Sequence, residues 1–179
     1  MDDLEKLAAL LQERNTVDLK ISQVIKRPAI QGHIGEFIAS RIFGIDLMAS
    51  ANNKAIDGYF TSGPLSGRSV DVKFYGKQEG VLDIKLDEQP DYFLILTGPR
   101  SPAISSKGHS RVCVIDHVYL FEGKNVADEV RLREVKLGVS TSLLKAQWEA
   151  AEIYPDQRNR AFLVTEYQRK LLGMFGSKE

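Results

Sequence analysis

The chain has 179 residues, and its 24 lysine and arginine residues are balanced by 24 aspartate and glutamate residues. A chain of this length can fold as one domain without disulfides or a structural metal. It lacks the overall basic charge of many nucleic-acid-binding proteins, and its single cysteine excludes both an internal disulfide framework and a cysteine-based zinc cluster. Because there is no signal-peptide pattern and no run of about 18 apolar residues, we expect a soluble, cytoplasmic protein.

The first predicted elements are helices. Leucines recur at helical spacing in residues 3–14, which predicts an amphipathic helix. Thr16 has a side chain suited to a helix N-cap, so a second helix is predicted over residues 17–27, ending before the proline that follows. A third helix is predicted within residues 28–44, where isoleucine and phenylalanine side chains form one stripe and Gly44 is suited to the C-terminal cap.

The middle of the chain changes to alternating apolar and polar residues, which is typical of β-strands. The turn-rich segment 61–67 separates the first two strand candidates and predicts that they pair as an antiparallel hairpin. A longer loop, residues 98–111, precedes the last strand candidate. The candidates are residues 56–61, 68–75, 81–86, 91–97 and 111–121.

The C-terminal part is predicted to be mainly helical. Residues 130–137 fit a strand or a helix about equally well, so both readings stay open. Residues 140–155 and 164–175 predict two closing helices around the polar connector 156–160. Together these elements predict one α/β domain with a mixed central sheet flanked by helices. Its parts are N-terminal helices in residues 1–27, a core in residues 28–121 and a C-terminal helical part in residues 138–179.

Two aspartates and a lysine lie in the predicted hairpin. Asp71 and Lys73 are two residues apart, so their side chains share one face of a strand. Asp57 begins the preceding strand, where a short hairpin can bring it beside Asp71. Neighbouring carboxylates repel each other unless a cation lies between them, and Mg²⁺ is commonly bound by one or two carboxylates with waters and phosphate oxygens. The alternative for these charges is an ordinary solvated strand face.

Glu36, in the third predicted helix, is the third acid of the candidate site. It lies near Gly32, Gly35 and Ser40, on a side where another backbone can approach closely, although a solvent-facing glutamate is the alternative. Residues 20–77 contain eight bases and four acids, a net charge of +4, so the rest of the chain carries −4. A carboxylate cluster in a basic surround is what metal-dependent cleavage of a polyanion requires.

The order of these motifs resembles the PD-(D/E)xK nuclease superfamily, which has the restriction-endonuclease-like fold. The motifs are GEFIA at residues 35–39, IDG at residues 56–58 and VDVK at residues 70–73, with Ile56 in the place of the proline that names the motif. The stretch 31–97 is similar to small bacterial proteins that share this pattern, and the resemblance to the superfamily covers about residues 28–97. The resemblance implies Mg²⁺-dependent hydrolysis of phosphodiester bonds, most directly by a DNA endonuclease, with Mn²⁺ as a second usable metal. The alternative is a nuclease-fold module that binds nucleic acid or a protein without cleaving.

The resemblance also implies a role for each site residue. Asp57, Asp71 and the backbone carbonyl of Val72 would bind Mg²⁺. Glu36 would bind the same ion through water or hold a second one, and Lys73 would orient the attacking water. We expect Lys73 to act as a positively charged stabiliser rather than as a base, because the adjacent carboxylates favour its protonated form.

Basic residues in the loop 98–111 are candidates for contacts with nucleic acid. Arg100, Lys107 and Arg111 could follow a phosphate backbone, although a solvated surface loop is the alternative. The expected partner is therefore nucleic acid, most directly DNA, and no membrane contact is expected. A homodimer is considered alongside a monomer.

Overall fold

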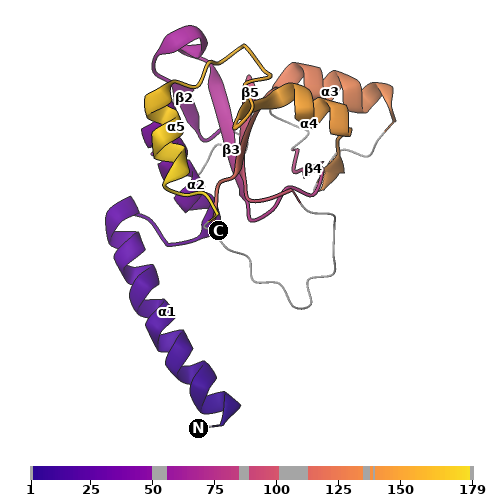
Figure 1. The fold of residues 1–179 in the computed structure, drawn as a ribbon. Coiled ribbons are helices and arrows are strands. Elements are labelled where there is room, and N and C mark those ends of the chain that lie inside the picture. Colours follow the sequence, from indigo (N-terminus) through magenta and orange to yellow (C-terminus); the bar gives the residue numbers. More distant parts are fainter. Residues whose placement is uncertain are drawn as a thin grey trace.

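The chain forms a mixed six-stranded sheet with helices packed on both faces (Figure 1). The strand order is β1-β2-β3-β5-β6-β8, in which β3 and β5 are parallel and the other neighbours are antiparallel. The predicted fold class, an α/β arrangement of a mixed central sheet flanked by helices, is confirmed. This computed structural model describes residues 2–49, 56–84, 89–100, 113–134, 138 and 140–177.

The N-terminal part is one continuous helix, α1 (Asp3–Ile25). The prediction of two helices divided at Thr16 is therefore wrong. The Thr16 hydroxyl donates a hydrogen bond to the carbonyl oxygen of Gln12 at 3.0 Å, one turn earlier, instead of capping a new helix. The helix ends where the sequence predicts, ahead of Pro28, and its C-cap Lys26 adopts a left-handed conformation with φ of 59°.

Helix α2 (Gln31–Phe43) confirms the third predicted helix, including its cap at Gly44. It packs closely on the central strand β3 (Ser69–Tyr75), since a Cβ atom on Gly35 would lie 2.5 Å from Cβ of Phe74. The predicted hairpin is also confirmed, because β2 (Gly58–Phe60) pairs antiparallel with β3. Its connection contains a short 3₁₀ helix, η1 (Gly63–Leu65), and the edge strand β1 (Ile45–Leu47) was not predicted.

The remaining predicted strands are present with shorter bounds. Of the candidate at residues 81–86, the described part forms only β4 (Val81–Leu82), and residues 85–88 lie outside the described residues. The candidate at 91–97 forms β5 (Tyr92–Thr97). The last candidate begins later than predicted, as β6 (His117–Glu122), and its residues 111 and 112 lie outside the described part.

The C-terminal region differs most from the sequence prediction. Helix α3 (Gly123–Leu132) accounts for the start of the segment that fitted either strand or helix, while residues 135–137 lie outside the described part. The helix predicted over residues 140–155 is wrong at both ends, because only its middle is helical. Helix α5 (Glu166–Gly173) confirms the last predicted helix. The segment 140–155 contains β7 (Thr141–Ser142), which pairs with β4, then α4 (Lys145–Ala151) and β8 (Glu152–Tyr154).

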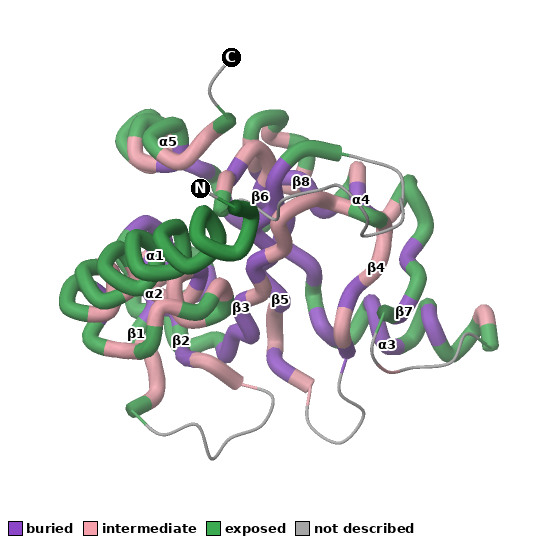
Figure 2. The backbone as a smooth tube through the Cα atoms, turned by 90° about the horizontal axis from the view of Figure 1, so that it is seen from below, coloured by how far each residue is buried: buried purple, intermediate pink, exposed green. Residues whose placement is uncertain are grey.

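The sheet separates two apolar clusters. On one face Val72 and Phe74 of β3 pack against α2 and α5, and on the other face Phe93 and Ile95 of β5 pack with α3 and α4. Buried residues follow the central strands in Figure 2, whereas most of α1 is exposed. Among the described residues, no helix has the length and apolar character needed to cross a membrane.

Candidate functional site

Strand β3 directs Asp71 and Lys73 toward the face of the sheet on which α3 and α4 pack. In the parallel pairing with β5, Asp71 lies opposite Phe93 and Lys73 lies opposite Ile95. Neighbouring residues in register point to the same face of a sheet, and both partners belong to the apolar cluster on that face. Asp71 is only 4% exposed, so its carboxyl group is nearly removed from water.

The two charges of β3 are in direct contact, and a second carboxylate lies beside them. Lys73 Nζ is 2.8 Å from Asp71 Oδ1. Asp57 Oδ2 accepts a hydrogen bond from the Val72 N–H at 2.7 Å, which fixes the Asp57 carboxylate against β3. Burial raises the pKa of Asp71 to about 7, and although the Lys73 ammonium opposes this rise, the Asp57 carboxylate adds to it. The predicted convergence of these three side chains is therefore present.

The backbone of Val72 faces the same edge of β3 as Asp57. In an extended strand the N–H and C=O of one residue point to the same side, and the Val72 N–H points to the Asp57 carboxylate. The Val72 carbonyl oxygen is therefore directed to the side of β3 where β2 begins. Two carboxylates and a carbonyl oxygen form a set of hard oxygen donors of the kind that Mg²⁺ prefers.

Glu36 does not join this group. It lies on α2, which packs against the opposite face of β3, and its carboxylate forms an ion pair with the guanidinium of Arg27. Across residues 2–49, 56–84 and the later described segments, no group of three or more histidine, cysteine, aspartate or glutamate side chains is arranged to hold a metal ion. The structure thus brings Asp57, Asp71 and Lys73 together and leaves Glu36 apart from them.

Arg100, a predicted contact for nucleic acid, binds a buried acid instead of pointing freely into solvent. Its Nη2 atom donates to both carboxylate oxygens of Glu152 at 2.8 Å, and its Nε donates to the hydroxyl of Tyr119 at 3.3 Å. These hydrogen bonds hold part of the guanidinium against buried groups, although the Arg100 side chain is 42% exposed. The other two predicted contacts, Lys107 and Arg111, lie outside the described residues.

Glu152 is the charged residue that sequence analysis missed. It is fully buried in β8 and contacts Arg100, His117 Nδ1 at 2.8 Å and Arg158 Nε at 3.6 Å. In the sequence it follows two alanines in a helical pattern, so nothing marked it as a buried strand residue. The cluster joins the ends of β5, β6 and β8, and its geometry is that of a structural network.

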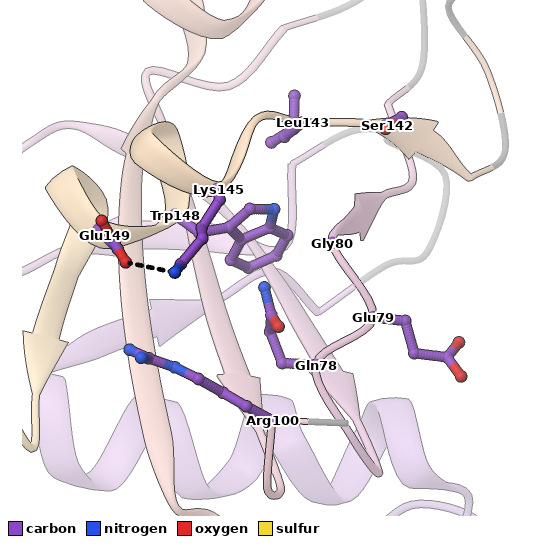
Figure 3. A pocket seen from close by; sticks show the side chains of 9 residues that line it. All are labelled: Gln78, Glu79, Gly80, Arg100, Ser142, Leu143, Lys145, Trp148 and Glu149. Carbon is purple, nitrogen blue, oxygen red and sulfur yellow. Dashed lines mark ion pairs between the residues drawn. The ribbon is translucent and has the colours of Figure 1, made fainter. Parts of the chain in front are cut away.

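A cavity of about 440 Å³ lies beside this cluster (Figure 3). It is lined by residues 78–80, which precede β4, by Ser142 and Leu143, by side chains of α4 and by Arg100. In the close view Lys145 points toward Glu149, with which it forms an ion pair of 3.6 Å, and Arg100 enters from the opposite side. Asp57, Asp71 and Lys73 do not line this cavity, so it is separate from the carboxylate group on β3.

A comparison of the chain with models of known protein families and with curated protein sequences finds no match in either. The interpretation of the site accordingly depends on its geometry. Its central features are a buried Asp71, an adjacent Asp57 and the ammonium of Lys73.

Proposed function

We propose that this chain is a divalent-metal-dependent nuclease of the PD-(D/E)xK type, which hydrolyses phosphodiester bonds in nucleic acid and most directly in DNA. The observation that carries this proposal is the close grouping of Asp57, Asp71 and Lys73 at the edge of β3. The grouping contains two carboxylates and one ammonium, so it has an excess negative charge when both carboxylates are ionised. A buried carboxylate in this position is costly when ionised unless a cation compensates it.

The donor atoms fit Mg²⁺, with Mn²⁺ as a substitute. Asp57, Asp71 and the Val72 carbonyl would hold the ion, and waters and phosphate oxygens would complete its coordination. Bound there, Mg²⁺ would supply positive charge to the phosphodiester and to the attacking water. Lys73 would hold that water by a hydrogen bond from its ammonium and stabilise the negative charge that develops on the phosphate oxygens. Asp57 would fix the ion against β3 through its bond to the Val72 N–H.

A second function is supported by the position of Glu36. Its ion pair with Arg27 removes the third carboxylate of the nuclease pattern from the other two. This arrangement favours a nuclease-fold module that binds nucleic acid or a protein without cleaving it. The two functions differ in whether the pair Asp57 and Asp71 binds a metal ion and whether that metal supports turnover.

The experiment that tests the proposal measures cleavage of single- and double-stranded DNA and RNA in Mg²⁺ or Mn²⁺, with a chelator control. The native protein is compared with Asp71→Ala and Lys73→Ala. We expect metal-dependent cleavage that falls by about a hundredfold or more in both variants, because each loses a group that stabilises the reacting charge. Asp46→Asn is the matched control, since Asp46 is an exposed aspartate on β1 of the same sheet.

Calorimetric titration with Mg²⁺ completes the test. Metal binding that is lost in Asp71→Ala, together with metal-dependent cleavage, supports the nuclease. Metal binding without cleavage of any substrate supports the binding module. Cleavage that persists in Asp71→Ala and Lys73→Ala would refute the proposed site, because that activity must come from other residues or from a contaminant.

A further inference from the structure

Helix α1 presents a line of exposed apolar side chains along its length. It is contacted by α2 near its C-terminal end, and Ile25 is the one buried residue of this fully described helix. The rest of α1 extends away from the sheet (Figure 1) and is almost entirely exposed in the view along it in Figure 2. In proteins most of the stability of a helix comes from tertiary packing of its apolar face, so an uncovered apolar face on α1 indicates a missing partner.

The spacing of these side chains is that of a coiled-coil seam. Residues 7, 10, 14, 17, 21 and 24 follow one another at alternating intervals of three and four, the heptad pattern that brings one face of a helix against another helix. Leu7, Leu10, Val17 and Val24 on this seam are each more than half exposed. We call these six positions the α1 seam. The buried residue Ile25 is not one of these positions, and most of the seam is left uncovered.

The charges of α1 and its adjoining residues are divided between the two halves. Residues 2–13 contain four acids and one base, a net charge of −3, whereas residues 14–27 contain four bases and one acid, a net charge of +3. Two such helices side by side in antiparallel orientation place each acidic half against a basic half. A parallel pair would place like charges together, and the helix dipoles would also repel. The helix is therefore electrostatically complementary to itself.

We propose that α1 pairs in antiparallel orientation with α1 of a second copy of this chain. The register that covers the whole seam places Leu7 opposite Val24 of the other copy and Leu10 opposite its Ile21. Arg14, which already pairs with Asp18 at 3.4 Å, then lies near the twofold axis opposite Val17. The aliphatic part of Arg14 can pack there while its charged end stays in water.

The flanking positions of this register are also complementary. Glu13 and Lys20 both lie on the same side of the seam, one position before a seam residue. In an antiparallel pair such positions face each other across the interface, so Glu13 of each copy lies near Lys20 of the other. A parallel pair would place Glu13 near Asp18 instead. The single polar seam position, Arg14, limits the stability of the pair and helps to fix its register. This inference is independent of the proposed nuclease activity.

The first test compares two leucines of equal exposure. Leu10 lies on the seam and Leu19 lies on the opposite side of α1, and each is 61% exposed, so neither substitution is expected to disturb the fold. Sedimentation equilibrium is measured over about a hundredfold range of concentration, because dimerisation depends on mass action. We expect the native chain and Leu19→Glu to approach twice the chain mass of 20.0 kDa, and Leu10→Glu to stay at the single mass. Circular dichroism verifies that both variants keep their helices.

The second test reverses the flanking charges. Glu13→Lys and Lys20→Glu should each weaken the dimer, since each places like charges across the interface, and the double variant should restore it because the pair is re-formed with opposite signs. A native chain that stays monomeric throughout the concentration range overturns the proposal. A dimer that survives Leu10→Glu overturns the seam as its interface, and a double variant weaker than both single variants overturns the antiparallel register.

Discussion

Asp71 makes the stability of the fold depend on pH, and Asp71→Asn should remove that dependence. Burial raises the pKa of Asp71 from 3.8 to about 7 in the folded protein. Between these two pH values the folded protein holds a proton that the unfolded chain has lost. The free energy of unfolding therefore falls as the pH rises through this range, and the loss is complete above about pH 7.

The magnitude follows from the difference between the two pKa values. At about 1.4 kcal/mol per pKa unit, a rise from 3.8 to about 7 corresponds to about 4 kcal/mol. Asparagine has nearly the same shape and no charge, so the variant is spared this loss. The native protein also has the attraction between Lys73 and the ionised Asp71, but the pKa of about 7 already includes that attraction, so it adds no separate dependence on pH. As the pH rises through this range, the free energy of unfolding of Asp71→Asn should therefore increase by about 4 kcal/mol relative to that of the native protein.

The assay is urea unfolding, followed by circular dichroism, of both proteins near pH 4 and near pH 8 without divalent metal. Other titrating groups are common to the two proteins and cancel in the comparison. Parallel stability curves for the native protein and Asp71→Asn across this range would refute the reasoning, since they would mean that Asp71 ionises as it does in the unfolded chain. Adding Mg²⁺ near pH 8 should raise the stability of the native protein and leave Asp71→Asn unchanged, because a ligand stabilises only the form that binds it.

Two further predictions concern packing elsewhere in the fold, and both are measured by urea unfolding at neutral pH. Arg100→Ala should lower the free energy of unfolding by about 2 to 3 kcal/mol, because it removes two 2.8 Å hydrogen bonds from the fully buried carboxylate of Glu152, which keeps its contacts with His117 and Arg158. Gly35→Ala should lower it by about 1 to 3 kcal/mol, because the added methyl group would lie 2.5 Å from Cβ of Phe74 and would force α2 away from β3.

Each of these substitutions has a matched control. Arg131→Ala removes an exposed ion pair of 3.4 Å with Asp128 within one helix and should change stability by less than about 1 kcal/mol. Gly173→Ala adds a methyl group with no atom within 4 Å and should be neutral or slightly stabilising. If Arg100→Ala costs no more than Arg131→Ala, the Glu152 cluster does not support the fold. If Gly35→Ala matches Gly173→Ala, the close approach of α2 to β3 is not required.

The elements that the sequence predicts well are those whose local signals agree with their tertiary contacts. Helix α2 has both an apolar stripe and a glycine cap, and β2 and β3 have alternating residues on either side of a turn. Strand β8 was missed because Glu152 and Ile153 continue the helical pattern of α4, and only pairing with β6 makes them a strand. At Thr16 the sequence predicts the start of a new helix that is not present, because a hydroxyl suited to an N-cap donates a hydrogen bond within α1 instead.

The residues of the candidate site likewise include some that a local sequence pattern places correctly and one that it does not. Asp57, Asp71 and Lys73 lie within one hairpin, so a local pattern is enough to predict that they meet. Glu36 forms an ion pair with Arg27, which lies in the turn between α1 and α2. No periodic pattern in the sequence predicts that ion pair. Burial is likewise a property of the assembled fold. The raised pKa of Asp71 could not be inferred until the apolar layer around it was known.

The unequal lengths of the strands limit how this sheet can meet other chains. Its long strands, β3, β5 and β6, are all interior, while each edge consists of only three residues, in β1 and β8. At the β8 edge the backbone N–H groups of Arg158 and Asn159 already donate to the carbonyl oxygen of Glu152, at 3.0 and 2.8 Å. Short edges expose few unpaired backbone groups, which disfavours strand-by-strand growth into aggregates. The two described edges of this sheet are therefore unsuited to fibrillar association by strand pairing.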